Sequence, residues 1–462
     1  MQRLLAIALL TWKAAFRFRL FWVVTVLLLA AVVGLPILIK DDGTARGFTQ
    51  ILLTYTLSVI TALLGLCTLW LACGTLARDI EECQMQVVAV KPIARWQIWL
   101  GKWLGIMSLN FALLVIAGGS VYGLLLWRAT QLPEDQRTVL RKEVMVARGS
   151  AKPPSVMADI EAAAVARFKE RIAKSPVASA DLAEVQKQII EQVKAEYQVV
   201  PPGYFKTWQV NLGLHRFFLQ GKPLHLRIKF NAAATSTAGT FTGLWQVGVP
   251  ETTKLWRSDP MSLAPDTFHE FEVPADLLDE NGVLNIAFMN PNETTLLFPL
   301  DEGIEVLFQE GGFGLNYLRG LGVIFCWMAL LATLGLAAAS FLSFPVAAFF
   351  SLALLTIAMA SGTLATVVTE GTIAGYDSEA GTMGKSVVDP VVVNVFRLLL
   401  WLVNLAKDFS PIDSLSTGRS VSWAELGRAC GQIVVLLGGL LAAFGIYSFS
   451  RRELATAQGT QG

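Results

Sequence analysis

The sequence predicts a polytopic α-helical membrane protein with six spans and both termini in the cytoplasm, interrupted by an extracytoplasmic α+β insertion that consists of a helical stalk and a β-sandwich. The first observation behind this prediction is composition: the 462 residues are 54% hydrophobic, with a mean hydropathy of +0.53. Soluble proteins are rarely so apolar. The second observation is distribution, because the apolar residues lie in runs near both ends, on either side of a polar block at residues 132–313.

The predicted spans follow from the length of the apolar runs. A membrane-spanning helix needs about 20 mostly apolar residues. The first membrane portion, residues 20–131, and the second, residues 314–462, supply six such runs: Leu20–Ile39, Gln50–Ala77, Trp103–Trp127, Leu315–Leu342, Pro345–Thr369 and Cys430–Phe449. A weaker stretch at residues 391–405 contains Arg397 and Asn404, and a charge makes a full crossing costly. We therefore predict a re-entrant or interfacial helix there.

Basic residues near the span ends give the orientation, since they favour the cytoplasmic side. They precede the first span, lie between the second and third, and follow the last: Lys13, Arg17, Arg19, Arg78, Lys91, Arg95, Lys102, Arg451 and Arg452. This places both termini and the link at residues 78–102 in the cytoplasm, and the polar block outside a cell membrane. Residues 1–19 mix basic and bulky apolar side chains, which favours a cytoplasmic interfacial helix; an ordinary extension of the first span is the alternative.

The polar block is predicted to have two parts. Residues 132–199 are rich in Ala, Glu, Lys and Arg, and we predict a helical stalk there. The apolar residues Leu182, Val185, Ile189 and Val193 recur at helical spacing, and Ser179 is the predicted N-cap of that helix. Pro153–Pro154 and Ser175–Pro176 divide the stalk into two or three helices.

In residues 200–313 the apolar period changes to two, which is typical of strands. Five segments show it: LHLRIKF (224–230), TFTGLWQVGV (240–249), FHEFEVP (268–274), VLNIAFMN (283–290) and GIEVLFQE (303–310). In the first of them Leu224, Leu226, Ile228 and Phe230 share one face. Several short strands separated by Gly, Pro and Asn predict a β-sandwich of jelly-roll type.

Trp245 and Trp256 are candidate contacts for an external ligand or a protein partner, because an exposed indole can stack on a sugar. The alternative is that both rings belong to the sandwich core. The three histidines, His215, His225 and His269, have a spacing that fits no metal motif.

The sequence contains no motif that indicates chemistry in this chain. The segment GTMGKS at residues 381–386 lacks the first glycine of a phosphate-binding loop, whose position is held by Glu379. We therefore predict no catalytic, cofactor-binding or metal-binding residues. The apolar runs are nearly free of ionisable side chains, which argues against an ion-coupled carrier. The net charge of +1 gives no indication of a nucleic-acid partner.

The link between the second and third predicted spans is unusually rich in charges, aliphatic residues and tryptophan. Residues 78–90 can form a short helix that Pro92 ends. Residues 93–103 are expected to lie along the membrane interface with their tryptophans at headgroup level, and Gly101 and Gly105 allow close helix packing. Such an element suits docking of a cytoplasmic partner; a passive interfacial turn is the alternative.

Three motifs of this link stand in a characteristic order: RDIE at Arg78–Glu81, KPIAR at Lys91–Arg95 and LGKWLG at Leu100–Gly105. This arrangement resembles the link between the second and third spans in ABC transporter permeases of the type-2 exporter class. The segments Ser340–Leu354, Phe409–Ala429 and Phe449–Leu454 are similar to later parts of the same class, in the same order. The large insertion between the third and fourth spans departs from the pattern, so the resemblance does not identify the substrate.

The resemblance implies a permease subunit that couples ATP hydrolysis by a separate cytoplasmic ABC ATPase subunit to export of a substrate. ATP and Mg would bind to that ATPase, and a second permease copy or a paralogue would complete the complex in the lipid bilayer. Residues 80–90 would be the coupling helix. The implied ATPase-coupling residues are Arg78, Asp79, Ile80, Glu81, Glu82, Met85, Val88, Lys91, Pro92 and Arg95.

Two other functions stay open. The first is a mechanotransmission complex, which would relay the motion of the ATPase through the stalk to an extracytoplasmic protein partner without moving a substrate. The second is a binding module that the spans only anchor. The stalk is the feature that favours mechanotransmission, because a simple pore does not need one.

Overall fold

The structure, a computed structural model, divides the chain into two compact units. The helical unit comprises Met1–Val146 and Gly312–Gly462, and the sandwich unit comprises Ala147–Gly311. The residues that the structure describes are 2–17, 19–38, 44–82, 93–140, 144–174, 182–213, 219, 222–234, 239–249, 253–374, 376–377, 382–383, 386, 388–407 and 409–452.

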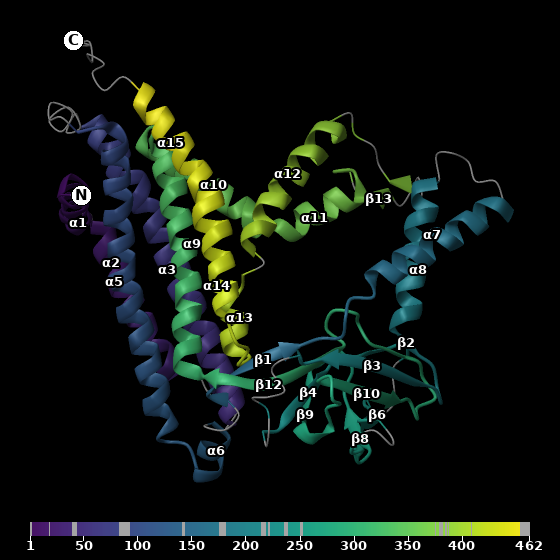
Figure 1. The fold of residues 1–462 in the computed structure, drawn as a ribbon. Coiled ribbons are helices and arrows are strands. Elements are labelled where there is room, and N and C mark those ends of the chain that lie inside the picture. The colour runs from purple at the N-terminus through teal and green to yellow at the C-terminus, as the bar shows by residue number, and fades with distance from the viewer. Residues whose placement is uncertain are drawn as a thin grey trace. The chain divides into compact units, whose positions relative to one another are not determined.

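The helical unit is built mainly from long helices (Figure 1). Before the sandwich unit these are α1 (Gln2–Arg17), α2 (Arg19–Leu38), α3 (Ala45–Glu81), α5 (Arg95–Ala129) and the short α6 (Glu134–Val139). After it come α9 (Phe313–Ala339), α10 (Phe344–Met359), α11 (Ser361–Glu370), β13 (Tyr376–Asp377), β14 (Thr382–Met383), α12 (Asp389–Lys407), α13 (Pro411–Ser416), α14 (Trp423–Ala429), a π-helical stretch η4 (Cys430–Gly438) and α15 (Gly439–Arg451).

Several of these helices have the length and composition of membrane spans. Among the described residues, five helices qualify alone, and two bent pairs bring the number to as many as seven. Large apolar side chains also point outward: Val26, Phe111 and Val435 are 61%, 58% and 68% exposed. Because soluble proteins rarely expose extended apolar faces, these features indicate a membrane-embedded protein.

Three predicted elements differ from the observed ones. The fifth run is not one straight helix, because α10 and α11 meet at a bend of 63°. The two helices meet at Ala360, where the backbone leaves the helical conformation (φ −79°, ψ 21°), directly before the Ser361–Gly362 pair; Gly/Ser pairs are common sites of helix kinks. The weak stretch at 391–405 belongs to the longer α12, which with α13 forms one of the five candidate spans. Residues 95–103 of the predicted interfacial segment are the first part of α5, which continues without a break to Ala129 as one candidate span.

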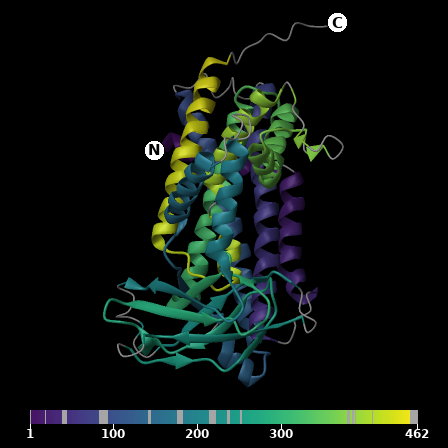
Figure 2. The same cartoon turned by 90° about the vertical axis from the view of Figure 1, so that its right-hand side faces the viewer.

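Helix α3 is at the centre of the helical unit and contacts α2, α5, α9 and α10 (Figures 1 and 2). Small residues bring the helices close together. A Cβ atom on Gly335 of α9 would lie 2.7 Å from Cβ of Ala72 and 2.9 Å from the carbonyl oxygen of Leu69, both on α3. Glycine at this point therefore permits backbone contact between α3 and α9, as is common in membrane helix bundles.

The sandwich unit contains two helices and most of the strands. Its elements are β1 (Val146–Ala151), α7 (Met157–Lys174), α8 (Leu182–Gln198), β2 (Val199–Val200), β3 (Phe205–Asn211), β4 (Leu224–Ile228), β5 (Asn231–Ala232), β6 (Phe241–Val247), β7 (Trp256–Arg257), β8 (Met261–Leu263), β9 (His269–Val273), the 3₁₀ turn η3 (Ala275–Leu277), β10 (Val283–Met289), β11 (Leu296–Leu297) and β12 (Ile304–Gly312).

Two main sheets form the β part of this unit. One has the strand order β1-β12-β4-β9, and the other has β3-β10-β6-β7 with β8 beside β6. Successive longer strands alternate between the sheets, since β3, β6 and β10 lie in one and β4, β9 and β12 in the other. The short strands β2, β11 and β5 form a third, small sheet.

Both main sheets bury alternate side chains in one hydrophobic core. The predicted inward face of β4 is confirmed, because Leu224, Leu226 and Ile228 are at most 1% exposed and Phe230 is 2% exposed. All five predicted strand segments are strands in the structure. The side chain of Asn290 is fully buried, and its amide donates to the carbonyl oxygens of Val200 and Thr294 at 2.9 Å, which joins β10 to the small sheet.

The predicted stalk is partly helical. Helices α7 and α8 pack together through Ile160, Ala164, Ile189 and Val193, which includes two of the residues that predicted the apolar face of α8. Residues 146–151, however, form strand β1 and lie beside β12, so the prediction of helix was wrong there. The predicted N-cap at Ser179 lies outside the described residues.

Candidate functional site

Five helix ends meet at one end of the helical unit, which we call the link end. They are the end of α3 at Glu81, the start of α5 at Arg95, the end of α9 at Ala339, the start of α10 at Phe344 and the end of α15 at Arg451 (Figure 1). Residues 83–92, which join α3 to α5, lie outside the described residues. They include four of the predicted coupling residues, Met85, Val88, Lys91 and Pro92.

An ion pair at the link end joins α3 to α5. The ammonium nitrogen of Lys102 lies 2.5 Å from a carboxylate oxygen of Asp79 and donates to the carbonyl oxygen of Thr75 at 2.6 Å. The Lys102 side chain is 6% exposed and that of Asp79 is 30% exposed. A charge this buried is tolerated only with a partner, so the pair fixes the end of α3 against the first turns of α5.

A second contact joins the end of α3 to the start of α10. A carboxylate oxygen of Glu81 accepts a hydrogen bond of 2.7 Å from the backbone amide of Phe344. This amide is in the first turn of α10, where it has no partner within the helix and a negative charge is favourable. The guanidinium carbon of Arg78 lies 4.3 Å from the centre of the Phe344 ring. Arg78 and Glu81 therefore hold Phe344 from the same helix end.

A third contact joins the start of α5 to the end of α15. One guanidinium nitrogen of Arg95 donates to the carbonyl oxygens of Phe449, Ser450 and Arg452 at 2.8–2.9 Å. The last carbonyls of a helix lack partners within it and carry partial negative charge, so a cation stabilises them.

The arginine that follows α15 extends this arrangement to α9. Arg452 donates to the carbonyl oxygens of Ala339 and Leu342 at 3.2 and 3.4 Å. The helix ends on either side of the link are therefore connected, through backbone caps and one ion pair, to α9, α10 and α15.

Two of the tryptophans in the first part of α5 point into the helix bundle. Trp99 is 1% exposed and donates to the Ser340 hydroxyl at 3.2 Å. Trp103 donates to the Thr333 hydroxyl at 2.9 Å. Trp96 is 45% exposed. The indole N–H groups of Trp99 and Trp103 thus bind hydroxyls on or next to α9.

Gly101 and Gly105 form the surface of α5 on which α1 packs. A Cβ atom at Gly101 would lie 2.7 Å from Cβ of Ile7, and one at Gly105 would lie 2.7 Å from Cβ of Thr11. Both pairs advance by four residues, so α1 and α5 run in the same direction here. The close helix packing predicted for the two glycines is confirmed, and its partner is the N-terminal helix.

The predicted coupling residues that the structure describes have different surroundings. Arg78, Asp79, Glu81 and Arg95 make the contacts above, and Ile80 packs against the core of the bundle; Glu82 is exposed. Sequence reasoning missed three of their partners, which are Lys102, Phe344 and Arg452. Lys102 was the one with a signal, because it is a lone charge at the start of an apolar run.

The two tryptophans proposed as external contacts lie in the sandwich unit. Trp245 is 2% exposed, and its ring centre lies 4.7 Å from that of Phe288, so the prediction of an exposed ring is wrong for Trp245. Trp256 is half-buried and stacks on Phe271 with ring centres 6.0 Å apart. Because the Trp245 ring is packed in the core, it is unavailable for stacking on a ligand.

The described residues contain no group of three or more His, Cys, Asp or Glu side chains placed to hold a metal ion. Three cysteines, Cys67, Cys73 and Cys326, are buried in the helical unit as free thiols. The arrangement at the link end is one of helix caps and an ion pair. These contacts therefore hold the helix ends together.

Comparison of the chain with protein families, with curated proteins and with solved structures finds no match.

Proposed function

We propose that this chain is the permease subunit of an ATP-driven ABC transporter of the type-2 exporter class, and that residues 80–90 dock on a cytoplasmic ABC ATPase. The observation that carries the proposal is the way both ends of the link are held. Asp79 and Glu81 tie the end of α3 to α5 and α10, and Arg95 ties the start of α5 to α15. A loose turn between two spans has no need of such contacts.

The contacts define a path along which a displacement of the link would reach the bundle. A force on the link acts on the C-terminal end of α3 and the N-terminal end of α5 together, because Asp79 and Lys102 join them. From α3 it passes to α10 through Glu81, and from α5 to α15 through Arg95. Packed helices move as rigid bodies rather than deform continuously, so the helices would shift as a group.

In this proposal, ATP and Mg bind to the partner ATPase and supply the driving reaction there. This chain contributes the docking segment and the moving helices, and the sandwich unit receives or releases the substrate on the other side of the membrane. A second copy of the chain or a paralogue completes the transporter. The exposed apolar side chains of α12, including Val391, Leu398 and Trp401, offer a surface for lipid or for that second subunit.

Val88→Asp tests the docking segment. We expect the full-length chain to co-purify with its ATPase from native membranes. The Val88→Asp variant should retain about a tenth or less of that ATPase, because burying a carboxylate in an apolar contact costs about 1–3 kcal/mol or more. Lys174→Asp, an exposed change on α7, is the control and should retain all of it. Unchanged ATPase recovery and activity with Val88→Asp would contradict the proposal.

Glu81→Arg and Glu81→Gln refine the test. Arginine removes the cap on Phe344 and reverses the charge, whereas glutamine keeps an acceptor oxygen at the same position. If the link transmits motion through this cap, Glu81→Arg uncouples the ATPase from the permease while Glu81→Gln keeps most of the coupling. Equal coupling in both variants would remove this contact from the path.

A mechanotransmission complex is the second candidate, and one observation favours it. Helices α7 and α8 form a hairpin with its own apolar cluster, and Arg167 makes a two-point ion pair with Glu196 across it, at 2.6 Å for each contact. At the end of α8, the ammonium group of Lys206 on β3 donates to the carbonyl oxygen of Tyr197. Such a hairpin can serve as a lever for a protein partner. Stimulation of ATPase activity by a substrate in liposomes would decide against this candidate.

A further inference from the structure

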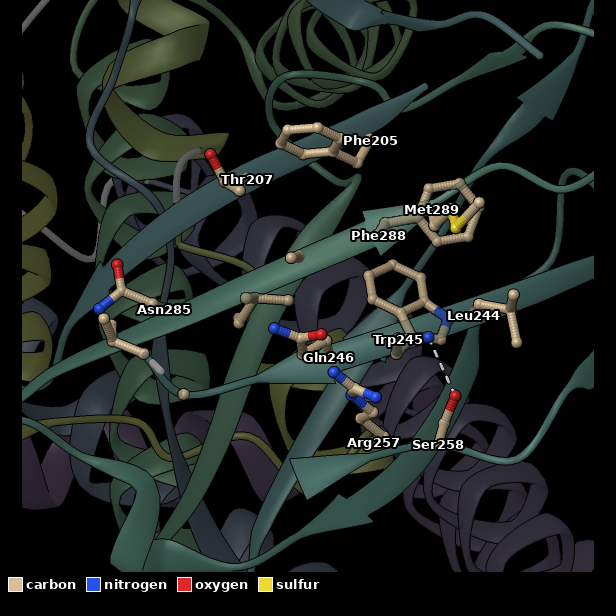
Figure 3. A pocket seen from close by; sticks show the side chains of 14 residues that line it. Phe205, Thr207, Leu244, Trp245, Gln246, Arg257, Ser258, Asn285, Phe288 and Met289 are labelled. Atoms are coloured by element: carbon tan, nitrogen blue, oxygen red, sulfur yellow. Dashed lines mark hydrogen bonds between the residues drawn. The ribbon is translucent and has the colours of Figure 1, made fainter. Parts of the chain in front are cut away.

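The outer face of the sheet β3-β10-β6-β7 carries a groove of about 710 Å³ (Figure 3). The volume is within the range of about 300–1,000 Å³ that is typical of ligand pockets. The alternation of exposure along β3 identifies the face, because Phe205, Thr207 and Gln209 are exposed while Val210 is buried.

The register of the strands arranges the lining side chains in two parallel rows. In the first row Phe205, Met289 and Leu244 stand opposite one another on β3, β10 and β6. Phe205 is 74% exposed and Met289 is 48% exposed. Three adjacent strands about 4.8 Å apart make this an apolar strip about 10 Å long.

In the second row Thr207, Ala287, Gln246 and Arg257 stand opposite one another on β3, β10, β6 and β7. This row is two residues further along each strand, which is about 7 Å from the apolar row. Ala287 is the smallest of the four, and it lowers the floor of the groove between Thr207 and Gln246. Asn285 follows Ala287 on the same face of β10 (Figure 3).

The polar row has unused binding capacity. Within the described part of the chain, no side chain or backbone group pairs with the guanidinium of Arg257 or with the side-chain amides of Gln246 and Asn285. An amide offers two donor hydrogens and an acceptor oxygen, and a guanidinium offers five donors in a planar fork that fits a carboxylate. The row therefore presents both hydroxyl-binding groups and one site for a carboxylate.

We propose that this groove binds an acidic oligosaccharide. A pyranose chain presents C–H faces along one flank and hydroxyl groups along the other over its whole length, which matches an apolar row beside a parallel polar row. A lipid is apolar at one end and polar at the other, so its chain would leave the amides of the polar row unpaired and desolvated, which is unfavourable. Arg257, at the end of the polar row, selects a sugar that carries a carboxylate.

The proposal concerns the sandwich unit alone and does not depend on the role proposed for the link. It is tested with the full-length chain in detergent and two probes that differ only in charge, the β-1,4-linked tetramers of glucuronic acid and of glucose. We expect the acidic tetramer to bind about tenfold more tightly than the neutral one, since a charge-assisted fork is about twice as strong as a neutral hydrogen bond.

Single substitutions test the contribution of the groove's lining residues to binding. Arg257→Ala should bring the affinity for the acidic tetramer down to that for the neutral one, a loss of about tenfold. Ala287→Leu should weaken the binding of both tetramers, because the leucine side chain would fill the floor of the groove. Arg167→Ala, which removes an exposed arginine of α7, is the matched control and should change neither. Three results would each overturn the proposal. Both tetramers could fail to bind at about 1 mM, or Arg257→Ala could bind the acidic tetramer as tightly as the unaltered chain does. The third is tighter binding of an Asp-rich peptide than of the acidic tetramer.

Discussion

Replacing Asp79 with alanine is expected to destabilise the protein by about 2–4 kcal/mol. The reason is that Lys102 stays buried, with a side-chain exposure of 6%, while its carboxylate partner is gone and only the carbonyl oxygen of Thr75 remains. Breaking a fully buried pair costs about 3–5 kcal/mol. The expected effect is smaller because Asp79 is 30% exposed and water screens part of the interaction. Denaturant unfolding in detergent measures the free-energy difference.

The double variant Asp79→Ala/Lys102→Met is the control for this prediction. It removes both charges and keeps an apolar side chain of similar length at position 102, so most of the lost stability should return. Because interacting residues give non-additive effects, the cycle of single and double variants measures the coupling of the pair. Equal destabilisation of the double variant and Asp79→Ala would show that the pair is not what holds α3 to α5.

Replacing Gly105 with alanine is expected to destabilise the protein by about 1–3 kcal/mol, as overpacking of a close contact does. The new Cβ atom would lie 2.7 Å from Cβ of Thr11, 2.9 Å from the carbonyl oxygen of Ala8 and 3.1 Å from its Cα atom. Two of these three atoms belong to the backbone, so α1 as a whole must move away. Unfolding of the purified variant, followed by the fluorescence of the tryptophans near the contact, measures the cost.

Gly119 and Gly123 provide matched controls on the same helix. A Cβ atom at either position would meet no atom within 4 Å. Alanine there should be neutral or stabilising by up to about 1 kcal/mol, since alanine is the better helix former. The sign of the effect should thus differ between Gly105→Ala and Gly119→Ala. If all of these alanine variants changed stability alike, the packing of α1 on α5 would be contradicted.

The strands that the sequence predicts correctly share a simple physical signal. In β4 bulky apolar residues alternate with polar ones, and in β10 buried Leu284, Ile286 and Phe288 alternate with more exposed residues; one buried face is enough to impose this period. Strand β1 lacks the signal, because its sequence VARGSA is short, small and buried at four successive positions. Its strand conformation depends on pairing with β12, a segment more than 150 residues away, which no local pattern reveals.

The helices show the same limit. The apolar runs predict the long helices, but the composition of residues 93–103 does not distinguish an interfacial helix from the first turns of a span. What decides is the contact of Gly101 with α1 and of Trp99 with Ser340. The apolar composition of the fifth run predicts one helix and does not reveal the 63° bend between α10 and α11.

The two candidate sites differ in how far sequence could lead to them. The link was recognisable because its charges and aliphatic residues are contiguous. The partner of Asp79 is 23 residues away on another helix, and that of Glu81 is a backbone amide, which carries no side-chain signal. The groove was not predictable, because Thr207, Ala287 and Gln246 come from three segments and form a row only once the register of the sheet is set.

The central claim is that the link between α3 and α5 docks on an ATPase in the cytoplasm. The most direct test places a photo-crosslinking amino acid at position 88 of the full-length chain in living cells, followed by irradiation and identification of the adduct. We expect a covalent adduct with a cytoplasmic ABC ATPase, and less of it when Pro92 is also replaced by alanine, which would extend the helix. An adduct formed only with proteins on the opposite side of the membrane would contradict it.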